Sequence, residues 1–213
     1  MSRAWCHTRC VTRLTVIRAG AGAAVIAGAC WVIKAAGILL TGDQLPGAFE
    51  FAFLLFPVAL VALYAVIGQR GGRLAMCGLV VAVTAELSAV VVGVGRLLGP
   101  ESWVPREDTV TVLTPFIVLA GFGTYVALLL LGLAVRRTQA LPERSRTLPL
   151  ALAVSAACLM LIGGALESLS DRLLEIPILL LGAGWITLGA VLAQQAMSSQ
   201  PSPAASPLPQ HFA

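Results

Sequence analysis

The chain has 213 residues, of which 58% are hydrophobic and 11% charged, and its mean hydropathy is +0.92. Soluble domains carry about 25% charged residues, so this composition excludes a soluble globular enzyme, a disordered protein and a fibrous repeat. It predicts a protein that lies in a lipid bilayer. The net charge of +4 does not indicate a nucleic-acid partner, because the distribution of basic residues among the loops explains it.

Six apolar runs are each long enough for a membrane crossing, which takes ~20 residues. Such runs must be helical, because lipid offers no partner for unpaired backbone groups. The sequence therefore predicts an all-α polytopic membrane protein, a bundle of six transmembrane helices within residues 19–195. The runs lie at about 19–40, 48–67, 74–98, 110–135, 148–166 and 173–193.

The two terminal segments are more polar than the rest of the chain. Residues 1–18 contain four arginines and are predicted to form a basic N-terminal arm in the cytoplasm. The apolar run after this arm is longer than the ~7–15 residues of a signal peptide, which favours an uncleaved first helix. Residues 196–213 are rich in Ser and Pro, which predicts a disordered cytoplasmic tail.

Basic residues are distributed unequally between the two sets of loops. Ten lie on the side of the termini and three on the other side. Because cytoplasmic loops carry the excess of Lys and Arg, this difference predicts a plasma-membrane protein with both termini in the cytoplasm. The ten are Arg3, Arg9, Arg13, Arg18, Arg70, Arg73, Arg136, Arg137, Arg144 and Arg146, and the three are Arg96, Arg106 and Arg172.

Two charged residues lie well inside predicted spans, away from their ends. Glu86 is in the middle of the third span, and Lys34, the single lysine of the chain, lies in the outer part of the first. A charge at mid-depth costs ~2.5–3.5 kcal/mol, so Glu86 is expected to face the bundle interior and to have a partner. One hypothesis makes Glu86 a proton- or cation-binding carboxylate with Lys34 as its counter-ion. The other makes it a structural link between helices, hydrogen-bonded to Lys34 or to a Thr or Ser side chain. In a separate alternative, Lys34 reaches outward to Glu50, Glu175 or the lipid headgroups.

Acidic residues gather on the side opposite the termini. This predicted outer rim includes Asp43, Glu50, Glu167 and Glu175. One interpretation is that short outer loops simply need solvated residues, and the other is that the rim concentrates cations or holds a divalent metal ion.

Residues that would supply familiar chemistry are missing. The two histidines, His7 and His211, lie near the termini, and the sequence has no zinc-protease, hydrolase or phosphate-loop motif. We therefore expect no metal, no cofactor and no enzymatic activity.

Small residues recur every fourth position in the first span, at Gly20, Ala24 and Gly28. This spacing places them on one helix face, where a neighbouring backbone can approach closely. The neighbour is either another helix of the same bundle, a second copy of the chain or another membrane protein.

Taken together, the six apolar runs, the Arg-rich loops and the Pro/Ser tail resemble those of small, uncharacterised multi-pass membrane proteins of high-GC Gram-positive bacteria. The resemblance rests on no diagnostic motif and implies no activity. The leading hypothesis is a non-enzymatic protein whose partners are the lipid bilayer and other membrane proteins. The alternative is a small proton- or cation-coupled transporter or channel that uses Glu86 and Lys34.

Overall fold

A computed structural model describes residues 3–42, 48–103, 110–167 and 170–199. These residues form helices and turns without any strand, so the prediction of an all-α fold is confirmed. The α-helices are α1 (Arg3–Thr41), α2 (Ala48–Ile67), α3 (Gly72–Leu98), α4 (Thr114–Thr138), α5 (Leu148–Glu167) and α6 (Glu175–Ser198). Short 3-10 helices are η1 (Gly68–Gly71), η2 (Glu101–Trp103), η3 (Glu143–Ser145) and η4 (Asp171–Leu174).

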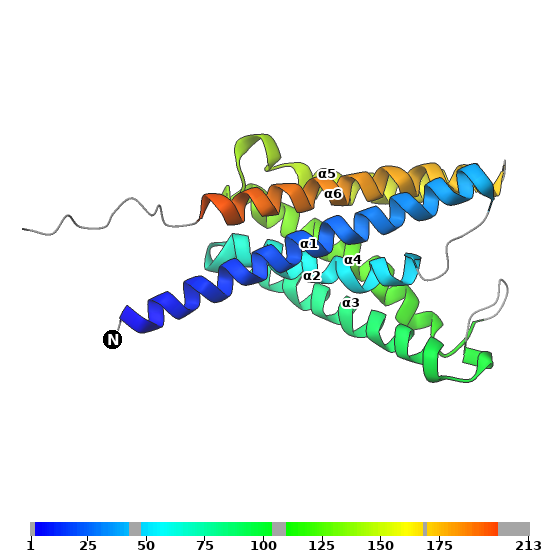
Figure 1. Cartoon of the computed structure of the whole chain (residues 1–213), viewed down its shortest axis with the longest axis horizontal. Coiled ribbons are helices and arrows are strands. Elements are labelled where there is room, and N and C mark those ends of the chain that lie inside the picture. Colours follow the sequence, from blue (N-terminus) through cyan, green and yellow to red (C-terminus); the bar gives the residue numbers. More distant parts are fainter. Residues whose placement is uncertain (1–2, 43–47, 104–109, 168–169, 200–213) are drawn as a thin grey trace, which may run out of the picture.

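Among the described residues, five helical stretches are long and apolar enough to cross a membrane, which is consistent with a multi-pass membrane protein. One of them, Phe51–Leu98, is 48 residues long and covers most of α2 and all of α3. The chain reverses direction at η1, where Gly68 and Gly72 have φ angles of 62° and 56°. Glycine adopts a positive φ at no steric cost, because it has no Cβ atom. The turn lets α2 and α3 lie antiparallel beside each other (Figure 1).

The first helix differs most from its predicted span. α1 begins at Arg3, so it includes most of the basic segment 1–18 as well as the apolar run 19–40. Hydropathy marks only the apolar part of a helix. Polar residues such as Thr12 and Arg13 belong to the same helix but lie before its apolar part. The other α-helices begin and end close to the predicted runs.

The first and last helices pack most closely together. A Cβ atom placed on Gly28 of α1 would lie 2.5 Å from the carbonyl oxygen of Gly182 in α6, and one placed on Gly182 would lie 2.7 Å from the oxygen of Gly28. Gly20 faces Ala62 of α2 instead. The row of small residues in α1 therefore contacts two helices of the same chain, as the spacing of these residues allows.

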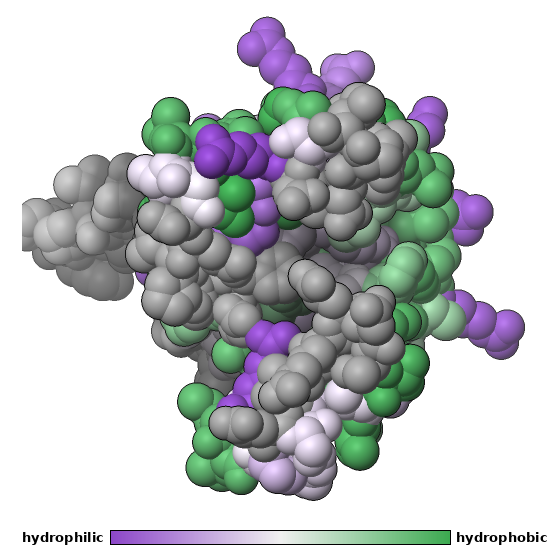
Figure 2. Space-filling model, turned by 90° about the vertical axis from the view of Figure 1, so that its right-hand side faces the viewer, coloured by the Kyte–Doolittle hydropathy of each residue, from purple (hydrophilic) through white to green (hydrophobic). Residues whose placement is uncertain are grey.

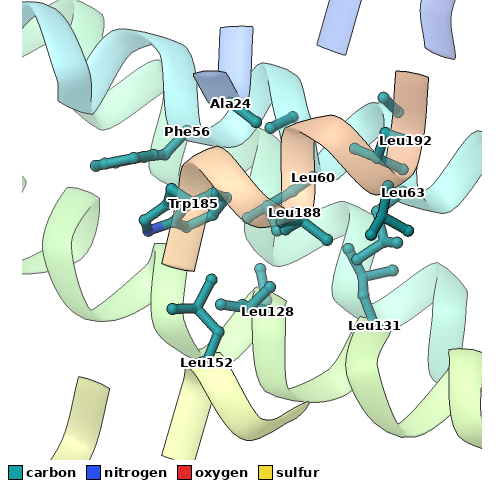
Figure 3. Close-up of a cluster of buried hydrophobic side chains, with 14 of the residues drawn as sticks. Ala24, Phe56, Leu60, Leu63, Leu128, Leu131, Leu152, Trp185, Leu188 and Leu192 are labelled. Atoms are coloured by element: carbon teal, nitrogen blue, oxygen red, sulfur yellow. The ribbon is translucent and has the colours of Figure 1, made fainter. Parts of the chain in front are cut away.

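The centre of the bundle is filled by large apolar side chains (Figure 3). Trp185 and Leu188 of α6 and Leu128 of α4 are completely buried. α1 contributes small residues such as Ala24, which leaves room for these larger side chains. The interior is therefore close-packed and apolar over its middle layer.

α3 and α4 form a second pair that leans away from α1 and α6 toward one end of the bundle (Figure 1). A glycine of each helix lies at their contact. Gly78 of α3 lies against Leu131, and Gly123 of α4 lies against Ala85. Much of the outer face of α3, including Leu87, is exposed.

The two ends of the bundle differ in charge. We call the end that contains the start of α1, η1, η3 and the end of α6 the basic end (left in Figure 1). Figure 2 looks onto the opposite end and shows hydrophobic residues around the flanks of the bundle. The described arginines of the basic end are Arg13, Arg18, Arg70, Arg73, Arg136, Arg137, Arg144 and Arg146.

Candidate functional site

A buried ion pair joins α1 to α6 near the end opposite the basic end. The Nζ atom of Lys34 lies 2.8 Å from Oε1 of Glu175, and the two residues are 7% and 4% exposed. Glu175 is the first residue of α6, where the positive end of the helix dipole also favours a carboxylate. The alternative in which Lys34 reaches Glu175 is therefore the one observed, and Glu175 is a buried residue instead of an exposed member of the outer rim.

The second oxygen of Glu175 is less well satisfied. Its Oε2 atom is buried and accepts no hydrogen bond from the described residues. Removing two charges from water costs several kcal/mol per ion, and only one of the carboxylate oxygens contacts Lys34 in compensation. The stability of the ion pair therefore depends on keeping this one contact between Lys34 and Oε1 of Glu175.

Aromatic rings fill the space next to this ion pair on the side of the bundle centre. Trp31, one helical turn before Lys34, meets Phe56 of α2 edge to face, with ring centroids 5.0 Å apart. Phe56 stacks on Trp185 of α6 at 4.3 Å (Figure 3), and Phe53 closes the group 5.9 Å from Trp31. Sequence reasoning missed this cluster, although the spacing of Phe53 and Phe56 on one face of α2 was a signal for it.

The other intramembrane carboxylate, Glu86, lies on α3 and is half-buried. Its Oε2 atom is buried without a hydrogen bond, and within the described part of the chain Glu86 forms no ion pair. α3 packs against α4 and α2, whereas α1 packs against α6 and α2. The structure therefore does not bring Glu86 and Lys34 together.

The remaining side chains of the predicted outer rim lie outside the described part of the structure. Asp43 lies outside the described residues, and so do the side chains of Glu50 and Glu167. Among the side chains that are described, no group of three or more His, Cys, Asp or Glu residues could hold a metal ion.

A surface groove runs between α1 and α6 at the basic end. Its volume is about 370 Å³, and apart from Arg18 its lining is apolar or small. The sequence signalled the small residues of α1 but not the groove, because its second wall comes from a helix more than 160 residues later. The lining residues are Arg18, Ala21, Gly22, Val25, Ile26, Gly189, Ala193, Ala196 and Met197.

Arg13 has a different role at the same end. Its Nε and Nη2 atoms donate hydrogen bonds to the carbonyl oxygens of Ala65 (2.9 Å) and Val66 (3.1 Å). The last carbonyls of a helix have no partner within that helix, so Arg13 caps the end of α2 and fastens it to α1.

These features were compared with known proteins. No protein-family model, no curated protein and no solved structure matches this chain.

Proposed function

We propose that the chain is a non-enzymatic scaffold or partner subunit of a bacterial plasma membrane, with six crossings and both termini in the cytoplasm. The 48-residue stretch Phe51–Leu98 supports two crossings in place of one, since a single crossing takes ~20 residues. The basic end supports the orientation, because arginine-rich loops stay in the cytoplasm.

The environment of Glu86 is the main support for the scaffold role. The side chain lies near the middle of α3 and has no hydrogen-bond or ion-pair partner among the described residues. An ionisable group in a membrane normally pairs with another polar group. We therefore assign its partner to a second protein: a hydrogen-bond donor on a neighbouring transmembrane helix, from another membrane protein or from a second copy of the chain.

Two features of the interior favour a scaffold over a transporter. Lys34, the proposed counter-ion of a transport site, is bonded to Glu175. The middle of the bundle is filled by side chains such as Trp185 and Leu128, which are 0% exposed, whereas transport needs a polar path to the carboxylate.

The test compares the size of the native complex among Glu86 variants, extracted in mild detergent and separated by native electrophoresis. Glutamine keeps the hydrogen-bonding capacity of Glu86, whereas leucine removes it. We expect the wild type and Glu86→Gln to migrate as a complex larger than the single chain, and Glu86→Leu to migrate as the single chain. Leu87→Ala, at the exposed neighbouring position, is the matched control and should keep the complex. A Glu86→Leu protein that still migrates with the complex would refute the scaffold role of this residue.

A proton- or cation-coupled transporter remains the second candidate, because Glu86 is ionisable and a scaffold would need only a neutral polar group. The variant Glu86→Gln separates the two functions, since glutamine cannot titrate. A transporter would move protons, Na⁺ or K⁺ across liposome membranes and lose this flux in Glu86→Gln. A scaffold would show no flux above that of protein-free liposomes and would keep its complex in the same variant.

A further inference from the structure

The groove between α1 and α6 combines an apolar trough with a single cationic side chain at one end. We propose that it binds one acyl chain of an anionic phospholipid, with the lipid phosphate held by the guanidinium group of Arg18. This inference rests on the proposed crossing of α1 but not on the scaffold role of Glu86.

The shape of the groove comes from small residues on both of its walls. Ala21, Gly189 and Ala196 line it without filling it. Gly22 is exposed, and a Cβ atom placed on it would meet no other atom within 4 Å. Val25 and Ile26, which are 37% and 50% exposed, complete an apolar surface that suits a hydrocarbon chain.

The charge of Arg18 determines which lipid fits. Arg18 is exposed and has no hydrogen bond or ion pair with the described residues, whereas Arg13 is occupied by the carbonyl groups of α2. At the basic end, the one described carboxylate is that of Glu143 in η3. A free guanidinium group in a positively charged region offers paired donors to a phosphate, and anionic lipids are attracted to such regions.

The depth of Arg18 agrees with this assignment. It comes directly before the apolar run that begins at residue 19, so its side chain reaches headgroup level. Ile26 follows eight residues later, or ~12 Å deeper at the rise of an α-helix. Going deeper into the membrane, the charge of Arg18 therefore comes first and the apolar groove second, in the same order as the headgroup and the acyl chain of a lipid.

A second copy of the chain fits the groove less well than a lipid does. Copies inserted in the same orientation carry Arg18 at the same depth, so a two-fold contact at this groove would bring two arginines together. Like charges in a membrane interface oppose association, whereas the phosphate of a lipid neutralises Arg18.

Native mass spectrometry of the full chain, titrated with phosphatidylglycerol or with phosphatidylcholine of the same acyl chains, tests this proposal. We expect the wild type to bind phosphatidylglycerol at least tenfold more tightly than phosphatidylcholine. Arg18→Gln should reduce this preference to less than twofold. Gly22→Leu adds an apolar side chain at a lining position where a Cβ atom meets nothing within 4 Å, and it should weaken the binding of both lipids. Arg73→Gln, an exposed arginine of the basic end outside the groove, is the control and should behave as the wild type.

Several results would overturn the proposal. Equal losses in Arg18→Gln and Arg73→Gln would indicate a general effect of surface charge. Undiminished lipid binding by Gly22→Leu would place the lipid elsewhere, and a dimer that this substitution dissociates would make a second copy the occupant. Circular dichroism and thermal unfolding verify that each variant is folded. Because these measurements read lipid binding to the single chain, they are independent of whether Glu86→Leu loses a protein partner.

Discussion

The α1–α6 pair and the α3–α4 pair each carry one intramembrane carboxylate, and the structure treats the two in opposite ways. In α1–α6, two glycines bring the backbones into contact, and Glu175 is buried on Lys34. In α3–α4, side chains such as Leu131 separate the backbones, and Glu86 has no partner in the described residues. The first carboxylate is therefore paired within the chain, whereas the second makes no hydrogen bond or ion pair with the described residues.

This difference shows that the position of a charged residue within a span does not decide its role. Lys34 and Glu175 bind each other because the small residues of α1 and α6 let these helices approach. Glu86 is flanked by equally small residues, Ala85 and Ala89, but α4 presents no basic side chain at that level. The available partners, more than depth alone, decide whether a charge in a span is paired within the chain.

The largest effect is expected from breaking the ion pair. Lys34→Met leaves Glu175 buried without its cation, and the loss of one partner of a buried pair costs about 3–5 kcal/mol. We expect a decrease of this size in the free energy of unfolding, measured at equilibrium in detergent micelles.

The double variant Lys34→Met/Glu175→Gln provides the control for this prediction. Replacing both charged groups removes the uncompensated carboxylate, so most of the lost stability should return. If the two single substitutions proved additive, the pair would contribute no coupling energy, and the contrast with Glu86 would disappear.

A smaller effect is expected from widening the contact between α1 and α6. In Gly28→Ala the new methyl group would meet the backbone of Gly182, which cannot move aside, so a loss of about 1–3 kcal/mol is expected. In Gly123→Ala the methyl group would lie 3.1 Å from the Cβ atom of Ala85, and a slight shift of α4 relieves this contact. In the same equilibrium measurement, Gly28→Ala should have a clearly lower free energy of unfolding than Gly123→Ala. Equal losses would show that both helix pairs accept an added methyl group equally well.

Gly22→Ala should change stability in the opposite direction. Position 22 is helical, exposed and open, and alanine in a helix is favoured over glycine by roughly 0.5–1 kcal/mol. We expect a gain of this size in thermal unfolding experiments. A loss would indicate that α1 is contacted at this position by a second protein or by another part of the chain.

The smallest change is expected for Glu86→Gln. The carboxylate makes no hydrogen bond with the described residues, so the isolated chain has no interaction to lose, and a change within about 0.5 kcal/mol is expected. Glu175→Gln, the same chemical change in the other pair, should instead destabilise strongly because it leaves Lys34 without a carboxylate. Comparable losses in these two variants would mean that Glu86 also has an internal partner.

The helices were predictable because lipid imposes a simple constraint on them. A run of apolar residues long enough to span the bilayer must satisfy its backbone internally, and hydropathy alone therefore located α2 through α6 closely. The start of α1 at Arg3 was not predicted, since a helix that leaves the lipid is no longer marked by apolar residues.

The candidate sites were only partly predictable. Sequence reasoning identified Glu86 as a residue that needs a partner, because charge is costly in lipid, and it named Glu86, Glu50 and Glu175 as possible partners of Lys34. It did not decide between the carboxylates for Lys34, and it missed the groove beside Arg18. Both depend on which helices become neighbours, and residues 141 positions apart, such as Lys34 and Glu175, carry no local signal of their contact.

The contact between the first and last helices also has a consequence for biosynthesis. Because 141 positions separate Lys34 from Glu175, a ribosome adding ~5–20 residues per second needs roughly 7–28 s to deliver the carboxylate after the lysine. During that interval the lysine has entered the membrane, or waits at its surface, without the glutamate. A chain truncated before α6 would lack the carboxylate of Glu175, so the buried ion pair forms only after the last helix has been made.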